Sequence, residues 1–399
     1  MKCVLVQADG LGDEPLAELN GKTPLEAAYT PHLDAMASRG ILGLVRTIPH
    51  GVPASCEAGS LAVLGYDPAR YRTGCAPLEA VAHGVTLGPG DVAFRLQLVT
   101  VELAEDGSEV LRDPTGGCPE AAEASAIVAD LARALEGDGI EVWEGRGYRH
   151  GLVWRGGEVR MRTVPPHAIV GTPLAAALPV GPGAERLRGL MRVARDVLAR
   201  QPACVARRAA GATAPNAVWL WGQGVAVRLP ALRERFPVTG AIVAGGDLER
   251  GLGRLAGLDV LEAVAAESSG AAVVSVALAA LETRDFVLVQ LPDADEAGHQ
   301  GDVAAKVAAI ERLDAAVVGP LLDGLRQRGG AWRLAVVPDH PTPCALRTHT
   351  ADPVPFVLYV AGDEEKAKGQ KRAYHERDAR ELGIFIAEGY TLIERLLRE

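Results

Sequence analysis

Six acidic and imidazole side chains are the residues of this sequence best suited to chemistry. They are Asp9, Asp295, His299, Asp339, His340 and His349. Asp295 and His299 stand four positions apart, so one helical turn would place both on one face with their ligand atoms converging. That spacing also arises by chance, but Asp339-His340 closely follows an apolar run and His349 comes nine residues later. Mixtures of carboxylate and imidazole suit Zn²⁺ or Mn²⁺, and the oxygen donors favour Mn²⁺.

Three of the acids follow apolar runs typical of buried parallel strands. Residues 3–8 end at Asp9, residues 286–291 lead to Asp295, and residues 334–337 lead to Asp339. In an open α/β sheet, ligands bind at the edge formed by the carboxyl ends of the strands. We therefore expect the three acids at one edge of a single sheet.

Helical periodicity alternates with these strands at residues 30–39, 57–64, 303–327 and 379–398, which predicts a doubly wound, mostly parallel α/β sheet. The pattern changes between residues 88 and 225. There we expect strands at 92–101, 141–149 and 151–163, and helices at 119–136 and 184–199. The sequence thus predicts a core formed by residues 1–87 and 226–399, with a smaller α/β domain inserted at 88–225.

The composition limits the classes of function. Of the 399 residues, 48% are hydrophobic and 23% charged, and no apolar run approaches the roughly 18 residues of a membrane span. A net charge of −10 argues against a nucleic-acid surface. The short apolar N-terminus soon meets Asp9 and Asp13, unlike a secretory signal, and the six cysteines form no CxxC pair. We expect a soluble cytoplasmic protein with reduced thiols and no nucleic-acid or membrane partner; nothing in the sequence indicates its oligomeric state.

Several segments carry a family resemblance that covers nearly the whole chain. Those at residues 9–13 (DGLGD), 20–28 (NGKTPLEAA), 64–68 (LGYDP) and 295–299 (DEAGH) resemble the cofactor-independent phosphoglycerate mutases of archaeal type. Residues 148–150, 216–224 and 339–356 are similar to bacterial relatives, some of them proposed to be homoserine kinases. Both groups belong to the alkaline phosphatase superfamily. The resemblance therefore implies a core sheet of alkaline-phosphatase type with an inserted domain that caps the substrate.

The resemblance also implies two divalent ions, Mn²⁺ or Zn²⁺, that clamp an in-line displacement at phosphorus. By position, Asp295, His299 and His349 would hold one ion, and Asp9, Asp339 and His340 the other. In the mutases a serine bridges the ions, attacks the substrate phosphate, and forms a phosphoenzyme that returns the group to a different hydroxyl.

The family serine falls on Cys56 in this chain, at the start of the predicted helix 57–64. A helix N-terminus favours both a thiolate and a phosphate, so Cys56 would serve as nucleophile and metal ligand, and a soft thiolate would shift the preference toward Zn²⁺. Three alternatives stay open. A slip of one residue would make Ser55 the nucleophile, Cys56 would be converted to formylglycine as in sulfatases, or the chain would be an inactive relative.

Other departures concern the substrate. The family commonly has Arg at the position of Cys75, an Ala-Gly-Arg element near residues 115–117, and a different loop where this chain reads Ala265-Ala-Glu-Ser-Ser-Gly270. The remaining candidates for binding an anionic substrate are Lys22, Arg95, Arg149, His150, Arg207 and Arg208. Guanidinium groups bind carboxylate and phosphate bidentately, although arginines on an acidic protein are more often solvated or paired.

The function that follows is a two-metal phosphotransferase resembling 2,3-bisphosphoglycerate-independent phosphoglycerate mutase, an isomerase acting on a small phosphorylated hydroxy acid through a covalent phosphoenzyme. Two alternatives remain. One is a homoserine-kinase-like or specialised-pathway phosphotransferase with a rebuilt substrate site, and the other is a catalytically inactive metal-binding relative.

Overall fold

The computed structural model describes residues 1–262, 270–362, 372–381 and 384–398. The chain forms two compact units. One combines Met1–Arg72 with Arg228–Glu399 and is called the core unit below, and the other, Thr73–Val227, is called the insert unit. Most of the 265–270 loop singled out above lies outside the described residues.

An eight-stranded sheet organises the core unit. In spatial order its strands are β13 (Phe385–Ile386), β2 (Ile41–Val45), β12 (Val354–Val360), β11 (Trp332–Val337), β1 (Lys2–Ala8), β10 (Phe286–Leu291), β8 (Gly240–Val243) and β9 (Asp259–Leu261). Only β12 runs antiparallel to its two neighbours. β1 lies between β10 and β11 and is parallel to both, so the carboxyl ends of these three strands meet at one edge.

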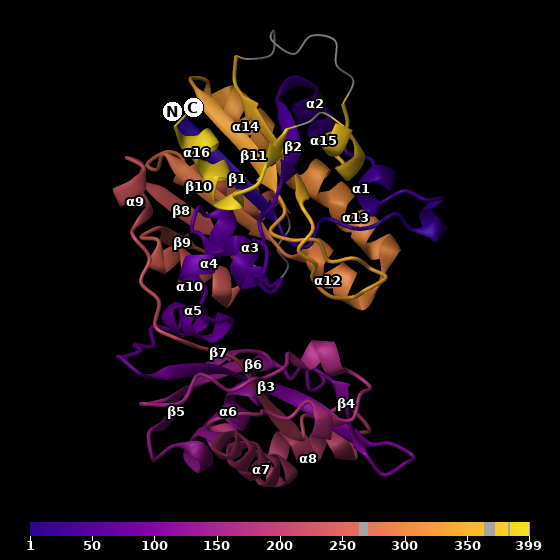
Figure 1. Cartoon of the computed structure of the whole chain (residues 1–399), viewed down its shortest axis with the longest axis vertical. Helices are drawn as coiled ribbons and strands as arrows, with labels where there is room; N and C mark the ends of the chain where they lie inside the picture. The colour runs from indigo at the N-terminus through magenta and orange to yellow at the C-terminus, as the bar shows by residue number, and fades with distance from the viewer. Residues whose placement is uncertain (263–269, 363–371, 382–383, 399) are drawn as a thin grey trace. The chain divides into compact units, whose positions relative to one another are not determined.

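Helices cover both faces of this sheet, as Figure 1 shows. On one face the apolar core joins β1 to α2 (Pro31–Arg39), α11 (Gly270–Ala280), α13 (Val303–Leu313) and α14 (Gly319–Arg328). On the other face it joins β1 to α3 (Cys56–Val63), α9 (Leu232–Arg235), α10 (Asp247–Leu255) and α16 (Leu392–Leu397). The near-continuous apolar strands are explained by this double cover. Shorter helices complete the unit: α1 (Pro24–Ala27), α4 (Pro68–Tyr71), α12 (Asp293–Gln300) and α15 (Glu376–Glu381).

The insert unit is a second α/β body. Its five-stranded antiparallel sheet consists of β3 (Val92–Leu103), β4 (Glu109–Asp113), β5 (Ile140–Arg146), β6 (Arg149–Trp154) and β7 (Ala217–Val225). α6 (Ala121–Leu135) and α7 (Ala184–Arg200) pack on one face, α5 (Cys75–Ala82) packs on the other, and α8 (Pro202–Ala209) follows α7. The unit begins at Thr73 rather than at residue 88, because the alanines of α5 pack against β3 and β6.

The predicted α/β fold with a mostly parallel core sheet is confirmed, while several predicted elements differ. The helix expected at 379–398 is wrong, because β13 joins the sheet beside β2 and separates α15 from α16. The strand expected at 141–149 ends at Arg146 before a turn at Gly147, and the one expected at 151–163 ends at Trp154 before a turn at Gly156. Both glycines have positive φ, a conformation that ends an extended strand. No helix within the described residues combines the length and apolar character needed to cross a membrane.

Candidate metal and phosphoryl-transfer centre

The strand order brings three acidic residues to one edge of the core sheet. Asp9 follows β1, Asp295 lies in the first turn of α12 just after β10, and Asp339 lies two residues beyond β11. The loop after β1 must approach α12 closely, since a Cβ on Gly10 would lie 2.5 Å from Cα of Asp295. Gly10 also has a φ of +63°, so both the close approach of α12 and the backbone conformation favour glycine at this position.

Asp295, His299 and His349 form the first group of converging ligand atoms. Nε2 of His299 lies 2.9 Å from Nε2 of His349 and 3.4 Å from Oδ2 of Asp295, while Nε2 of His349 lies 3.4 Å from Oδ1 of Asp295. One ligand atom from each residue falls within 4.8 Å of the others. Nδ1 of His299 lies 3.0 Å from the carbonyl oxygen of Arg347, which favours a proton on Nδ1 and a lone pair on Nε2.

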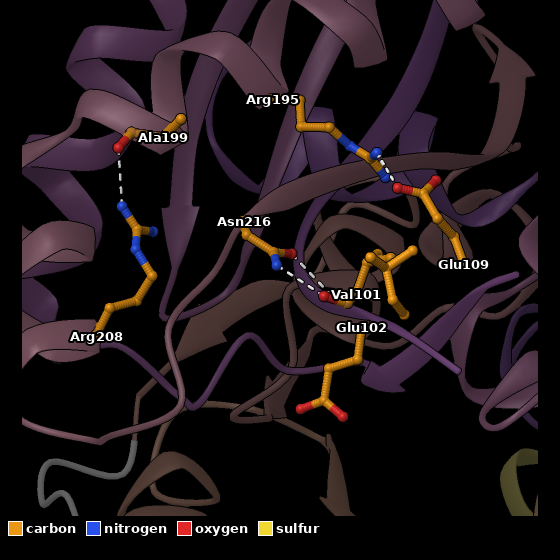
Figure 2. Close-up of a pocket in the computed structure, with 8 residues that line it drawn as sticks. Val101, Glu102, Glu109, Arg195, Ala199, Arg208 and Asn216 are labelled. Carbon is orange, nitrogen blue, oxygen red and sulfur yellow. Dashed lines mark hydrogen bonds and ion pairs between the residues drawn. The ribbon is translucent and has the colours of Figure 1, made fainter. Parts of the chain in front are cut away.

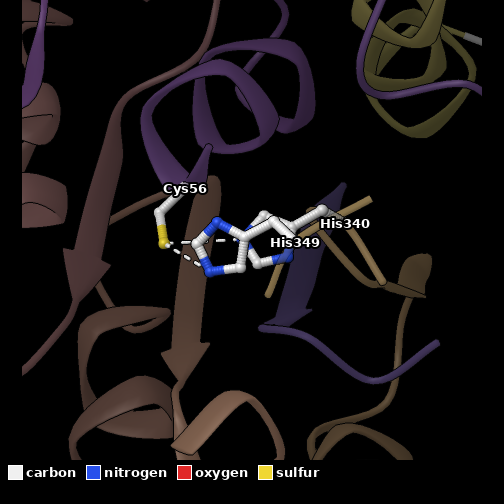
Figure 3. A group of neighbouring side chains, drawn as sticks. All are labelled: Cys56, His340 and His349. Atoms are coloured by element: carbon white, nitrogen blue, oxygen red, sulfur yellow. Dashed lines mark hydrogen bonds between the residues drawn. The ribbon is translucent and has the colours of Figure 1, made fainter. Parts of the chain in front are cut away.

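Cys56, His340 and His349 form the second group, shown in Figure 3 at the start of α3. Sγ of Cys56 lies 3.4 Å from Nε2 of His340 and 3.9 Å from Nε2 of His349. The two imidazole rings stack with their centroids 3.9 Å apart. His349 therefore contributes to both groups and joins them into one cluster.

The residue before Cys56 has a different role. Ser55 is the N-cap of α3, and its hydroxyl accepts a hydrogen bond from the backbone N–H of Ala58 at 3.2 Å. A serine at this position satisfies one of the N–H groups that a helix N-terminus leaves without a partner. The first helical residue, Cys56, is the one whose side chain lies against the histidines.

Asp9 is held by two glutamines that sequence analysis did not single out. Gln7 and Gln290 are register partners on β1 and β10, and their amides donate to Oδ1 of Asp9 at 2.8 Å and to Oδ2 at 2.5 Å. Gln7 also donates to the hydroxyl of Ser60 on α3. A signal was present in the sequence, because each glutamine interrupts an apolar strand, and a buried amide needs a hydrogen-bond partner.

Asp339 presents one satisfied and one unsatisfied oxygen. Its Oδ1 accepts from the backbone N–H groups of Gly10 at 3.1 Å and His340 at 2.8 Å. Its Oδ2 is buried, has no hydrogen-bond partner within the described part of the chain, and lies 3.0 Å from Nε2 of His340. A buried carboxylate oxygen without a donor is costly, and a cation beside it removes that cost.

The buried negative charges of the centre raise the pKa values of its neighbouring acidic groups. Burial, together with the charges of Asp339 and Glu249, raises the pKa of Asp9 well above its usual value. Burial and the neighbouring charges of Asp295, Asp339 and Asp9 likewise raise the pKa of the Cys56 thiol. Positive charge at this position would oppose both shifts.

The pKa values of Asp295 and of two histidines are shifted by burial and by their charged neighbours. Burial acts to raise the pKa of Asp295, but His299 and His349 hold it well below its usual value. Burial acts to lower the pKa of His340, and the charge of Asp339 raises it nonetheless. Burial and the neighbouring His340 lower the pKa of His349.

The residues present fit divalent metal ions. Three observations support this: an unsatisfied carboxylate oxygen on Asp339, Nε2 atoms of His299, His340 and His349 directed into one cluster, and a donor set of oxygen, nitrogen and sulfur. The structure brings together Asp295, His299 and His349, which the resemblance assigned to one ion. For the other ion it places Asp339 and Cys56, both expected ligands, beside His340, and it directs both oxygens of the expected ligand Asp9 to glutamine amides.

Two arginines expected to bind substrate have structural partners. Arg95 forms a bidentate ion pair with Glu79, with Nε 2.8 Å from each carboxylate oxygen, and lies over the ring of Trp221. Arg207 donates from all three nitrogens, to Glu123 and to the carbonyl oxygens of Gly117 and Thr213. These guanidinium groups are occupied within the insert unit.

Arg208 lines a pocket of about 370 Å³ in the insert unit, shown in Figure 2. Its guanidinium donates to the carbonyl of Ala199, Arg195 pairs with Glu109, and Asn216 pairs with Val101. The guanidinium and amide groups of these lining side chains are thus engaged in hydrogen bonds and ion pairs with other residues of the protein.

The other three candidates differ in exposure. Arg149 is exposed and lies over the ring of Tyr148, and Lys22 is exposed in the core unit. His150 is buried, with Nδ1 accepting from the N–H of Gly145 at 3.1 Å, and burial lowers its pKa to about 4. Of these three, Arg149 and Lys22 are the accessible cations, and Arg208 is exposed as well.

Comparisons with known proteins identify the family of this chain. The family model of 2,3-bisphosphoglycerate-independent phosphoglycerate mutase matches residues 37–203. The chain is 43% identical to a Geobacter sulfurreducens protein named probable 2,3-bisphosphoglycerate-independent phosphoglycerate mutase, over 100% of both chains. It is 40% identical to a Methanothermobacter thermautotrophicus protein named 2,3-bisphosphoglycerate-independent phosphoglycerate mutase 2, over 100% of this chain and 97% of the relative.

Solved structures give the same result. A protein from Pyrococcus horikoshii matches with a TM-score of 0.77 and 27% identity, over 99% of this chain and 96% of the other. A cofactor-independent phosphoglycerate mutase from Thermoplasma acidophilum matches with a TM-score of 0.58 and 25% identity, over 100% and 99%. The chain therefore belongs to the 2,3-bisphosphoglycerate-independent phosphoglycerate mutase family.

Proposed function

We propose that this protein is a metal-dependent phosphoglycerate-mutase-like isomerase. It would move a phosphoryl group between two hydroxyls of a small phosphorylated hydroxy acid, with Cys56 as the nucleophile. The observation that carries the proposal is the position of the Cys56 thiol, 3.4 Å from Nε2 of His340 and 3.9 Å from Nε2 of His349 at the N-terminus of α3. The relatives named as mutases supply the reaction class.

The residues support a two-step transfer. In the first step Sγ of Cys56 attacks phosphorus, an S–P bond forms, the P–O bond of the substrate breaks, and the released alkoxide takes a proton. In the second step the other hydroxyl attacks the phosphocysteine, loses its proton, and breaks the S–P bond. The alkoxide takes one proton from water in the first step and the second hydroxyl returns one to water in the second, because Nε2 of His349, the nitrogen beside Sγ, is assigned to a metal ion and would hold no proton.

Two divalent ions would supply positive charge that favours the thiolate and neutralises the phosphoryl oxygens. One ion would be bound by Asp295, His299 and His349. The other would be bound by Asp339, His340 and Cys56, near Asp9. A thiolate with several imidazoles is a donor set that favours Zn²⁺ over Mn²⁺. Asp9, held by Gln7 and Gln290, adds negative charge beside the second group.

The test is incubation of the metal-loaded protein with 3-phosphoglycerate. We expect 2-phosphoglycerate by an enolase-coupled assay, and an adduct of about 80 Da, one phosphoryl group, on the intact protein. Cys56→Ala should abolish both, whereas Ser55→Ala should retain turnover because Ser55 caps α3. The reverse pattern would make Ser55 the nucleophile.

Two other outcomes would replace the proposal. Phosphoryl transfer from ATP to homoserine, without mutase turnover, would select the homoserine-kinase-like alternative. Binding of two metal ions without any phosphoryl transfer would identify a non-catalytic metal-binding relative.

A further inference from the structure

Arg347 has an unusual backbone conformation in the loop that joins two histidines of the centre. It lies between His340 and His349, and its φ of +56° is in the left-handed region. Glycine adopts that region at little cost, whereas a residue with a long side chain is kept there only by its surroundings. We therefore expect the arginine side chain to have a function at this position.

The backbone of Arg347 is anchored next to the first group of ligand atoms. Its N–H donates to the carbonyl of Pro343 at 2.8 Å, and its own carbonyl oxygen lies 3.0 Å from Nδ1 of His299. The main chain of Arg347 is thus held against a residue of the centre.

The guanidinium group of Arg347 is held against the end of α12. A Cβ on Gly301, the residue that follows α12, would lie 2.5 Å from Nε of Arg347 and 3.0 Å from its Cζ and its Nη2. The guanidinium therefore lies directly on the glycine backbone. Because Gly301 is two residues beyond His299, both the main chain and the side chain of Arg347 contact the turn that supplies His299.

The donors of this guanidinium group are not used by the protein. Within the described ranges, the Arg347 side chain forms no hydrogen bond and no ion pair. The last carbonyls of α12, those of Ala297 and Gly298, accept from the backbone N–H groups of Asp302 and Gly301 instead. The side chain is exposed, so it combines a fixed position with donors that a ligand can reach.

We propose that Arg347 is a specificity-determining residue that binds the carboxylate of the substrate. The inference rests on the proposed function in taking the substrate to be a small phosphorylated acid. The phosphoryl group of such a substrate would lie at Cys56 and the ligand groups, so its carboxylate is the anion left for a separate partner. A guanidinium binds a carboxylate bidentately, and one that is already fixed loses little conformational entropy on binding.

Three substitutions of Arg347 separate its charge from its backbone. Arg347→Gln removes the charge but keeps a Cβ, so the cost of the left-handed conformation is unchanged. Arg347→Lys keeps the charge without the bidentate geometry. Arg347→Gly suits the left-handed backbone and replaces Arg347→Gln if glutamine prevents folding.

Arg312 provides the matched control. It lies on α13, which packs against α12, and its side chain is exposed, with Nη2 3.9 Å from Oδ1 of Asp293. Arg312→Gln therefore removes an arginine charge from the same part of the core unit without removing the proposed contact.

The experiment is a calorimetric titration of the Zn²⁺-loaded full-length chain with 4-phosphonobutanoate and with butylphosphonate. These ligands have the same carbon chain and differ only in a terminal carboxylate or methyl group. Their C–P bond is not a transferable phosphate ester, so binding is measured without turnover. The natural chain and Arg312→Gln should bind 4-phosphonobutanoate about tenfold more tightly, the value of one charge-assisted hydrogen bond. Arg347→Gln should bind the two ligands alike, and Arg347→Lys should keep part of the preference.

Steady-state kinetics with 3-phosphoglycerate give a second readout. Arg347→Gln should raise KM about tenfold and change kcat by less than about threefold, because a carboxylate that does not react is bound equally in the ground state and the transition state. If Arg347 only supported the position of His299, its replacement would lower kcat instead.

The outcomes separate this inference from the proposed function. Arg347→Gln with an unchanged preference for 4-phosphonobutanoate would refute the inference, as would an equal loss for both ligands or an equal loss in Arg312→Gln. A preference that depends on Arg347, in a chain that transfers no phosphoryl group, would refute the proposed function and leave the carboxylate site. If the natural chain binds neither ligand, both fail.

Discussion

Replacing Lys306 with Met should destabilise the core unit more than any surface change. The side chains of Lys306 and Asp13 are fully buried, and Nζ donates to Oδ2 of Asp13 at 2.8 Å and to the carbonyls of Gly12 at 3.0 Å and Thr342 at 2.9 Å. One ammonium group therefore links the loop after β1 to the loop after β11. Methionine has a similar length but supplies no hydrogen and no charge.

The magnitude follows from removing one partner of a buried ion pair, which costs about 3–5 kcal/mol because the other charge is left buried. For a unit of roughly 240 residues, 1 kcal/mol shifts the melting temperature by about 2–4 °C, so we expect a fall of about 6–20 °C. Scanning calorimetry of the full chain measures it. Lys22→Met, at an exposed position, is the control and should change the melting temperature by less than about 2 °C.

Lys306→Met combined with Asp13→Asn tests the reasoning further. Asparagine still accepts from the N–H of Cys344, which donates to Oδ2 of Asp13 at 3.0 Å in the natural chain. The double variant leaves no unpaired charge, so its loss should be smaller than the sum of the single losses by more than about 1 kcal/mol. Additive losses, or a Lys306→Met variant as stable as the natural chain, would refute the assignment of Lys306 as a buried structural cation.

Three further predictions concern both units. Arg95→Met should lower the melting temperature of the insert unit, since Glu79 would be left buried and unpaired, whereas Arg149→Met at an exposed position should not; equal effects would contradict the structural role of Arg95. The free energy of unfolding of the insert unit should fall by about 3 kcal/mol as the pH is lowered from 6.5 to 4. The reason is that His150 takes up a proton over this interval in the unfolded chain, whereas in the folded chain its pKa is about 4. A pH series of melting curves measures the change, and His150→Asn should remove it. Chelation of bound ions should lower the melting temperature of the core unit alone, and an equal fall in both units would place the ions elsewhere.

The strand-end acids were predictable because the relevant constraints are local. An apolar run followed by Asp identifies both a buried strand and its carboxyl end, and this holds for β1 and Asp9 and for β11 and Asp339. The four-residue spacing of Asp295 and His299 needs only one helical turn, which α12 supplies. The strands of a parallel sheet share one carboxyl edge, so this prediction did not require the order of the strands.

The helix expected at 379–398 shows where local pattern fails. Apolar residues spaced three and four apart continue through the segment, but Phe385 and Ile386 pair with β2 as a parallel edge strand. Pairing of that kind depends on a strand more than 300 residues earlier in the chain. Periodicity carries no information on such a partner, so tertiary pairing overrides it.

The same argument separates the ligands from the residues that hold them. The contacts that support the centre join residues 47 positions apart for Thr342 and Asp295, 281 for Gln290 and Asp9, and 293 for Lys306 and Asp13. A ligand is recognisable by its own type, whereas a supporting residue is defined only by the atom it reaches. The arginines show the opposite case. Arg95 is a residue type expected to bind an anion, yet its guanidinium group is paired with Glu79. For this reason metal ligands can be proposed from a single sequence, while the side chains that tune them, and those free to meet a substrate, have to be identified from contacts.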